Sequence, residues 1–347
     1  MKVETGIPTN DLRAAGDAAR RMEQLGYDGI VTPEVKNDPF LPLAAAAITT
    51  DRVSLGTSVA IAFPRSPMIT ALMSWDIQRA SGGRFILGLG SQVKGHVQRR
   101  YSAFWSGHAQ PQMKEYIQAI KAIWHTWETG EKLDVRGEYY THTLMTPEFN
   151  PGPVPGGAPK VMISAVGPAM ARLAGEVCDG VRMHGFCTAK YVQDVIWPEL
   201  RVGADRAGRD PNTLEVSGGG FIVTGATQAE VEKNLEAART RVSFYGSTRT
   251  YHGVFQAHGW TDIGPRLHEM SLKGQWDTMP AAVPDDVLDQ FVVAGTYDDI
   301  VQKIKDRFGG ICTRIGFSIP IRSPEDEERL KVMIRQLQEE RTPAAAR

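Results

Sequence analysis

Short β-branched runs alternate with longer amphipathic segments along nearly the whole chain, and this alternation constrains the fold more than any other feature. Strands that alternate with helices pair in parallel and are covered on their faces by those helices. Eight such strand and helix units predict an α/β fold of the TIM (β/α)8 barrel type. The predicted strands are Lys2 to Ile7, Asp28 to Thr32, Val53 to Ala60, Phe85 to Gly90, Lys160 to Ala165, Asp179 to His184, Glu215 to Val223 and Thr313 to Ile319.

The sequence predicts helices in three of the intervening segments. Asp11 to Leu25 repeats apolar residues at the helical period and stops at Gly26, and Met113 to Thr129 does the same before Gly130. A third helix begins near Pro168.

The length of 347 residues suits one barrel domain over residues 1–340 with insertions. Two regions are longer than the connections of a minimal barrel. They are 91–159, around the Met113 helix, and 240–284. Long excursions of a barrel usually carry specificity. The low-complexity run Pro343 to Ala346 predicts a disordered tail over 341–347.

Composition excludes several classes of partner. The 39 basic and 40 acidic residues include no basic block, so we expect neither nucleic acid nor an anionic membrane surface as a partner. We expect no export signal and no membrane span, because the start lacks an apolar core region and no stretch of about 18 apolar residues occurs. Three cysteines without a C-x-x-C pair favour a reducing cytoplasm, and the balanced charge favours a small organic substrate.

Hydrolytic chemistry is disfavoured. The eight histidines are scattered, with no H-E-x-x-H, so we expect no metal site. No G-x-S-x-G nucleophile motif occurs either. A bound organic cofactor is therefore the expected source of reactivity.

The carboxyl ends of barrel strands form the active-site face, so the residues after each predicted strand are the candidates. Glu34 follows the second strand and is a candidate acid, base or cofactor contact; pairing with Lys36 or capping of the next helix is the alternative. Asp38, before Pro39, resembles a helix N-cap. The third strand ends in Thr57, Ser58 and Val59, where the lack of side-chain bulk would let a flat ring lie against the backbone. The alternative is an ordinary layer of small residues inside the barrel.

The fourth strand ends in Gly90, Ser91 and Gln92, followed by His96. Val93 replaces the third glycine of a dinucleotide fingerprint, but the glycines still allow close approach of a ligand. His96 is a candidate proton donor, or a solvated loop histidine.

The fifth strand ends in Ala165, Val166 and Gly167 and passes directly into the helix at Pro168. Free N–H groups at such a start can bind phosphate, with Arg172 adding positive charge; an ordinary turn is the alternative.

The chain resembles the luciferase-like flavin and deazaflavin oxidoreductases. The resemblance rests on Leu55-Gly56-Thr57-Ser58-Val59, on Phe85 to Ser91 and on Ala165-Val166-Gly167-Pro168. Within that family, Thr32-Pro33-Glu34-Val35, Gly95 to Tyr101 and His258-Gly259-Trp260 are most similar to the coenzyme F420-dependent branch.

This resemblance implies hydride transfer between coenzyme F420 and an organic substrate, with Glu34 or His96 assisting proton transfer. It implies a cis peptide at Ser58–Val59 behind the deazaflavin ring, a cleft lined by Gly90, Ser91 and Gln92, and a phosphate turn at Val166–Gly167. It also implies a homodimer.

The same resemblance leaves two alternative functions open, a reduced-FMN monooxygenase and a non-catalytic flavin-binding protein. The Asp-His pair that some F420 enzymes carry after the second strand is replaced by Pro33-Glu34, so their histidine chemistry does not transfer. The polar and aromatic residues of the second insertion are candidates to shape a pocket for a larger, partly apolar molecule. They are Arg241, Tyr245, Ser247, Thr248, Tyr251 and His258.

Overall fold

The computed structural model describes residues 1–218 and 220–340, and the predicted tail at 341–347 lies outside them. Its main sheet has the strand order β3-β2-β1-β13-β10-β9-β8-β5-β4, with β3 also paired to β5, so that the sheet returns on itself. The predicted TIM barrel is thereby confirmed. The barrel strands are β1 (Lys2–Gly6), β2 (Gly29–Thr32), β3 (Ser54–Thr57), β4 (Ala60–Ile61), β5 (Phe85–Gly90), β8 (Lys160–Ser164), β9 (Gly180–Arg182), β10 (Glu215–Ser217) and β13 (Arg314–Gly316).

The third predicted strand is interrupted. Instead of one run from Val53 to Ala60, β3 ends at Thr57 and β4 begins at Ala60. β3 pairs with β2 and β5, and β4 resumes pairing with β5 in the register Ala60↔Leu89. Ser58 and Val59 therefore lie outside the ladder, at the strand end where the sequence predicted a ligand.

The seventh predicted strand, Glu215 to Val223, is wrong as a single element. β10 ends at Ser217, and the next strand, β11 (Phe221–Gly225), pairs instead with β12 (Val292–Thr296) in a separate parallel sheet. Gly218 and Gly220 have φ values of 94° and 121°, which interrupt an extended strand and which side-chain-bearing residues rarely adopt.

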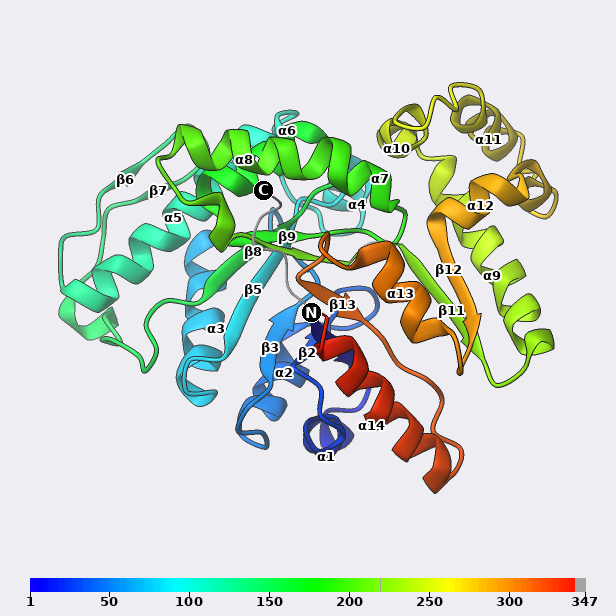
Figure 1. Cartoon of the computed structure of the whole chain (residues 1–347). Coiled ribbons are helices and arrows are strands. Elements are labelled where there is room, and N and C mark those ends of the chain that lie inside the picture. Colours follow the sequence, from blue (N-terminus) through cyan, green and yellow to red (C-terminus); the bar gives the residue numbers. More distant parts are fainter. Residues whose placement is uncertain (219, 341–347) are drawn as a thin grey trace. The chain divides into compact units, whose positions relative to one another are not determined.

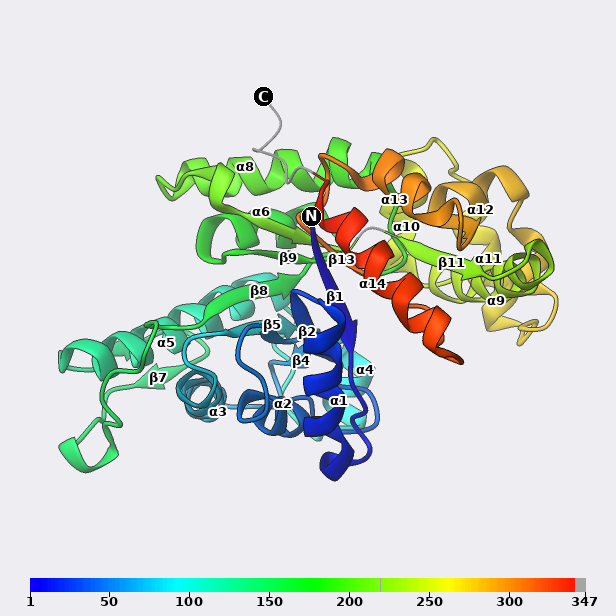
Figure 2. The same ribbon diagram turned by 60° about the horizontal axis from the view of Figure 1, so that its bottom comes forward.

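The chain comprises two compact units. The first unit contains Glu4–Ser164 and Leu173–Arg182, with α1, α2 and α3 lying side by side outside its strands (Figure 2). Asp11, predicted as the first residue of this helix, is the N-cap of α1, and Gly26 ends the helix at φ 98° as predicted. A core of three tryptophans joins α3 to α5: Trp75 lies 6.2 Å from Trp124 and 5.5 Å from Trp127, measured between ring centroids. The helices and minor strands of this unit are α1 (Leu12–Leu25), α2 (Phe40–Ala47), α3 (Pro67–Ala80), α4 (Lys94–Arg99), α5 (Ala109–Thr129), β6 (Val135–Arg136) and β7 (Thr141–His142).

The second unit contains Met1–Val3, Ala165–Arg172 and the chain from Met183 onward. In it α9 and α13 pack against the β11–β12 sheet (Figure 1). The insertion predicted at 240–284 holds the end of α9, two further helices and 3-10 turns. The α-helices are α6 (Pro168–Val177), which begins in this unit, α7 (Ala189–Tyr191), α8 (Trp197–Arg206), α9 (Gln228–Gly246), α10 (His252–Gln256), α11 (Ile263–Leu272), α12 (Asp285–Phe291), α13 (Ile300–Phe308) and α14 (Pro324–Gln338). The expectation of a single domain over 1–340 stays a prediction.

Candidate functional site

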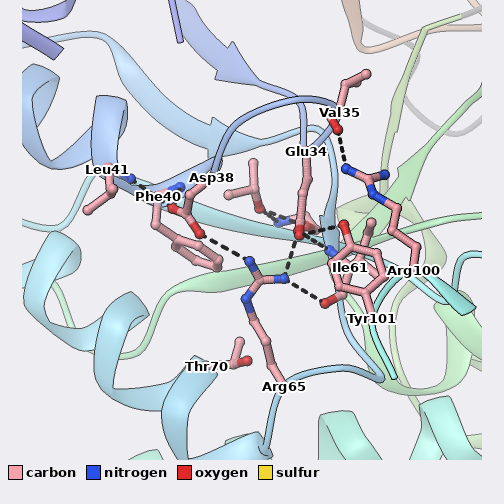
Figure 3. A network of polar contacts seen from close by, with 12 residues as sticks. Glu34, Val35, Asp38, Phe40, Leu41, Ile61, Arg65, Thr70, Arg100 and Tyr101 are labelled. Carbon is pink, nitrogen blue, oxygen red and sulfur yellow. Dashed lines mark hydrogen bonds and ion pairs between the residues drawn. The ribbon is translucent and has the colours of Figure 1, made fainter. Parts of the chain in front are cut away.

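Glu34 lies in the loop after β2, with a side chain that is only 6% exposed. Its Oε2 accepts hydrogen bonds from the backbone N–H of Ile61 and from Arg65 Nη1, each at 2.7 Å. Its Oε1 accepts a third from the hydroxyl of Tyr101 at 3.0 Å (Figure 3). The carboxylate therefore pairs with Arg65, and not with Lys36.

Arg65 is the cation at the centre of this network, between Glu34 and Asp38 (Figure 3). Its Nη2 donates to Asp38 Oδ2 at 3.0 Å, and its guanidinium lies over the Phe40 ring. Burial acts to lower the pKa of Arg65, but the hydrogen bond and charge of Glu34, together with Asp38, raise it overall. Asp38 also accepts from the N–H of Phe40, so it caps α2 as predicted. Sequence reasoning missed Arg65, because the pairing spans 31 residues and has no local signal.

Tyr101 ties the segment after α4 to the loop after β2. Besides its bond to Glu34, its ring lies under Arg100, which donates to the carbonyl of Val35. Burial and the adjacent Glu34 carboxylate raise the pKa of Tyr101, so its hydroxyl stays protonated and remains a donor. The network thus connects three segments that meet near the strand ends of the first unit.

The peptide bond between Ser58 and Val59 is cis, which confirms that prediction. Ser58 N–H donates to the carbonyl of Thr32 at 2.8 Å, and the carbonyl of Val59 accepts from the N–H of Glu34 at 3.4 Å. Both residues are half-buried, whereas Thr57 and Ala60 on either side are fully buried. The Ser58 hydroxyl has no hydrogen-bond partner within the described residues.

The hydroxyl of Thr57, unlike that of Ser58, is hydrogen-bonded within the barrel. This hydroxyl donates to the carbonyl of Gly88 at 2.6 Å and accepts from the N–H of Gly88 at 2.9 Å. It therefore bridges β3 and β5 inside the barrel wall.

The small residues around this strand also make room for a buried ion pair. Arg182 contacts Glu4 at 2.9 Å, and both side chains are 3% exposed. A Cβ on Gly56 would lie 2.7 Å from Arg182 Nη2, and one on Gly88 would lie 3.1 Å from Arg182 Cδ. Part of the small-residue layer therefore accommodates an arginine.

Gly90, Ser91 and Gln92 continue from β5. A Cβ on Gly90 would meet Val59 Cγ2 at 2.7 Å and Ser164 Oγ at 3.1 Å, so this glycine lets Val59 approach the end of β5. Gln92 has φ 60°, and its Oε1 accepts from the N–H of Val93. Ser91 and Gln92 are half-buried beside the strand end.

His96 lies on α4 and is exposed, and its side chain makes no hydrogen bond to a described residue. Its carbonyl accepts the N–H of Tyr101 at 3.0 Å. The structure therefore brings Glu34 and Tyr101 together through side chains, whereas His96 joins them only through its backbone.

In the second unit, the turn at Ala165, Val166 and Gly167 leads into α6. The hydroxyl of Tyr191 donates to the carbonyl of Val166 at 2.7 Å and fixes the turn. A Cβ on Gly167 would meet no atom within 4 Å, so open space adjoins this position. Arg172 pairs with Glu199 at 2.6 Å, and that it adds positive charge at the turn stays a prediction.

Within residues 1–218 and 220–340, no group of three or more His, Cys, Asp and Glu side chains is arranged to hold a metal ion. Among the helices of these residues, none combines the length and apolar character needed to cross a membrane. Cys178, Cys187 and Cys312 are buried.

Comparison with known proteins identifies the family. The family model for luciferase-like monooxygenases matches residues 2–313. The chain belongs to the luciferase-like monooxygenase family.

Three similar proteins illustrate the range of this luciferase-like family. An uncharacterized protein of Mycobacterium tuberculosis is 44% identical, with 91% of this chain and 92% of that protein covered. The 5,10-methylenetetrahydromethanopterin reductase of Methanolobus tindarius is 29% identical, over 94% of this chain and 96% of the reductase. The solved coenzyme F420-dependent tetrahydromethanopterin reductase of Methanopyrus kandleri matches with a TM-score of 0.73 at 21% identity, covering 97% of this chain and 99% of that one.

Proposed function

We propose that this luciferase-like protein is a coenzyme F420-dependent oxidoreductase that transfers a hydride between the deazaflavin ring and a small organic substrate. The observation that carries the proposal is the interrupted strand at Ser58–Val59, half-buried beside Gly90 in a chain 29% identical to a methylenetetrahydromethanopterin reductase. When bound, coenzyme F420 would supply or accept the hydride.

The residues at this strand end fit a planar ring with a polar edge. The backbone of Ser58 and Val59 would lie against the ring, and Gly90, Ser91 and Gln92 would line its border. The Ser58 hydroxyl and Gln92 Nε2 have no partners in the described part of the chain, which leaves both groups available to a ligand. Thr57 would hold the wall behind them through Gly88.

We assign the cofactor phosphate to the turn of Ala165, Val166 and Gly167. N–H groups in the first turn of a helix have no partner within the helix and attract anions. Tyr191 would keep the Val166 carbonyl turned aside by its hydrogen bond.

Glu34 and His96 are the proposed proton-transfer groups, and their surroundings favour different roles. The Glu34 carboxylate accepts three hydrogen bonds, which suits a residue that holds Arg65 and Tyr101 in position. His96 has a ring free of described partners and suits exchange of a proton with substrate. His96→Gln should lower turnover and leave the urea midpoint unchanged, because His96 is exposed, whereas Glu34→Gln should lower both.

The decisive experiment is titration of the purified protein with coenzyme F420 and with FMN, followed by assay of F420 absorbance with a panel of organic carbonyl compounds. Binding of F420 with substrate-dependent oxidation or reduction supports the proposal. Micromolar FMN binding without F420 binding refutes it and favours the second candidate, a reduced-FMN monooxygenase, which the family description supports. Binding without turnover of any compound favours a flavin-binding protein.

A matched pair of variants tests the phosphate assignment. Gly167 borders open space, so Gly167→Asn and Gly167→Asp should both fold. Two unit charges about 5 Å apart at an effective dielectric constant of about 40 repel by about 1.7 kcal/mol, so Asp should weaken F420 binding at least tenfold relative to Asn. Equal affinities of the two variants would refute the placement.

Homodimer formation and a cytoplasmic location stay predictions. Light scattering of the eluted protein would test the dimer.

A further inference from the structure

Three ring side chains with polar tips meet in the second unit. His184 stands two residues after the end of β9, Tyr245 lies on α9, and Tyr251 ends the 3-10 turn Arg249–Tyr251. The His184 ring centroid lies 4.3 Å from that of Tyr245, at an interplanar angle of 73°, and 5.2 Å from that of Tyr251. The two tyrosine rings are 6.2 Å apart.

The protonation of His184 follows from its hydrogen bond. The backbone N–H of Phe186 donates to Nδ1 at 2.9 Å, so in the neutral ring the proton must be on Nε2. Burial lowers the pKa of His184, which keeps the ring neutral at pH 7. His184 therefore presents an uncharged N–H donor at the carboxyl end of a barrel strand, where catalytic and binding groups of this fold gather.

The side chains of this cluster carry hydrogen-bonding atoms that the described part of the chain does not satisfy. Within the described residues, His184 Nε2 and the hydroxyls of Tyr245 and Tyr251 have no hydrogen-bond partner. All three side chains are half-buried. Burial also raises the pKa of Tyr251, so its hydroxyl is uncharged and can donate. Three hydrogen-bonding side chains thus share one ring cluster without an internal partner for their polar atoms among the described residues.

An exposed aromatic surface adjoins the cluster. Tyr245 packs against Phe244 at 5.3 Å, and Phe244 packs against Trp276 at 5.9 Å, both measured between ring centroids. Phe244 is 50% exposed and Trp276 is 47% exposed. Large aromatic side chains that remain this exposed beside polar groups are typical of ligand sites.

We propose that His184, Tyr245 and Tyr251 bind the carbonyl oxygen of an uncharged, ring-containing substrate, whose hydrocarbon part rests on Phe244 and Trp276. The neutral donors match a carbonyl acceptor, and the flanking rings match a flat apolar body. This inference rests on the proposed function, since it names the substrate class of that oxidoreductase.

The test measures binding to the full chain without any cofactor, so its outcome is independent of F420 affinity. The probes are 2-acetylnaphthalene, which carries a ketone, and 2-ethylnaphthalene, which lacks it; saturation-transfer NMR and calorimetry report affinity. In His184→Phe, which keeps a ring, affinity for the ketone should fall about fivefold, as for loss of one neutral hydrogen bond. Affinity for the hydrocarbon should be unchanged.

Two further variants complete the design. Trp276→Ala should weaken both probes equally, and the control His125→Phe, at an exposed position of α5, should weaken neither. Tyr251→Phe removes only a hydroxyl and supplies the same ketone-selective readout if His184→Phe does not fold. Failure of the parent protein to bind either probe, or equal effects of His184→Phe and Tyr251→Phe on the ketone and the hydrocarbon, would overturn the proposal.

Discussion

Replacement of Glu34 by glutamine tests whether its charge holds the network around Arg65. The substitution keeps the size of the side chain and one oxygen acceptor but removes the negative charge from a group that is 6% exposed. Hydrogen bonds to charged groups stabilise by about 1.5–3 kcal/mol and neutral ones by about 0.5–1.5 kcal/mol. Each of the two bonds to Oε2, from Arg65 and Ile61, should therefore lose about 1–1.5 kcal/mol.

The expected sum is a loss of about 2–3 kcal/mol in the free energy of unfolding, somewhat less than the roughly 3–5 kcal/mol seen when one partner of a buried ion pair is deleted. Urea unfolding followed by circular dichroism measures it. Asp38→Asn is the matched control, because it makes the same chemical change on the other side of Arg65. Asp38 is 33% exposed, and asparagine still caps a helix, so this variant should lose at most about 1 kcal/mol.

The comparison of these two variants decides the point. If Glu34→Gln is destabilised no more than Asp38→Asn, the charge of Glu34 does not hold Arg65. A loss of turnover in Glu34→Gln would then have to come from proton transfer itself.

Three other features give expected outcomes. Gly88→Ala should unfold at clearly lower urea concentration or fail to fold, because a Cβ there would lie 1.9 Å from the carbonyl oxygen of Thr57; an unchanged midpoint would contradict this packing. Iodoacetamide at pH 8 should leave Cys187 unmodified in the native protein, since burial raises the pKa of this thiol to about 12, and mass spectrometry should find it modified only after unfolding. Burial lowers the pKa of His184 and of His252 below 6.5, so the unfolded chain takes up protons first as the pH falls. The stabilisation that comes from keeping these two histidines neutral should therefore be fully present above pH 6.5 and decline below it. Equal urea midpoints at pH 7.5 and 5.5 would contradict these shifts.

The barrel was predictable because most of its strands have strong local signals. The run Phe85 to Gly90 matches β5 residue for residue. The break at Ser58–Val59 followed from family resemblance, since nothing in a run of small and β-branched residues marks it. The seventh strand was placed incorrectly because β-branched residues on both sides of Gly218 and Gly220 suggested continuity, although adjacent glycines often end strands.

The site was less predictable because its contacts are tertiary. Glu34 was identified by its place after a strand, but its partners Arg65 and Tyr101 come from segments 31 and 67 residues away. His184 is the last residue of a predicted strand, so the sequence does not mark it as a candidate hydrogen-bond donor. Only the fold shows that it stands beyond the strand, with its Nδ1 occupied by Phe186.

The pairing of β11 with β12 has a consequence for how this protein can change. Five successive residue pairs, from Phe221↔Val292 to Gly225↔Thr296, fasten both ends of the segment that carries Tyr245, Tyr251 and Trp276. α9 covers this sheet, so a replacement segment must supply a helix in its place, whereas the residues after α9 can lengthen or shorten while the pairing keeps the register of both strands. A graft bounded at Gly225 and Val292 that brings such a helix is therefore the natural unit for redesigning specificity.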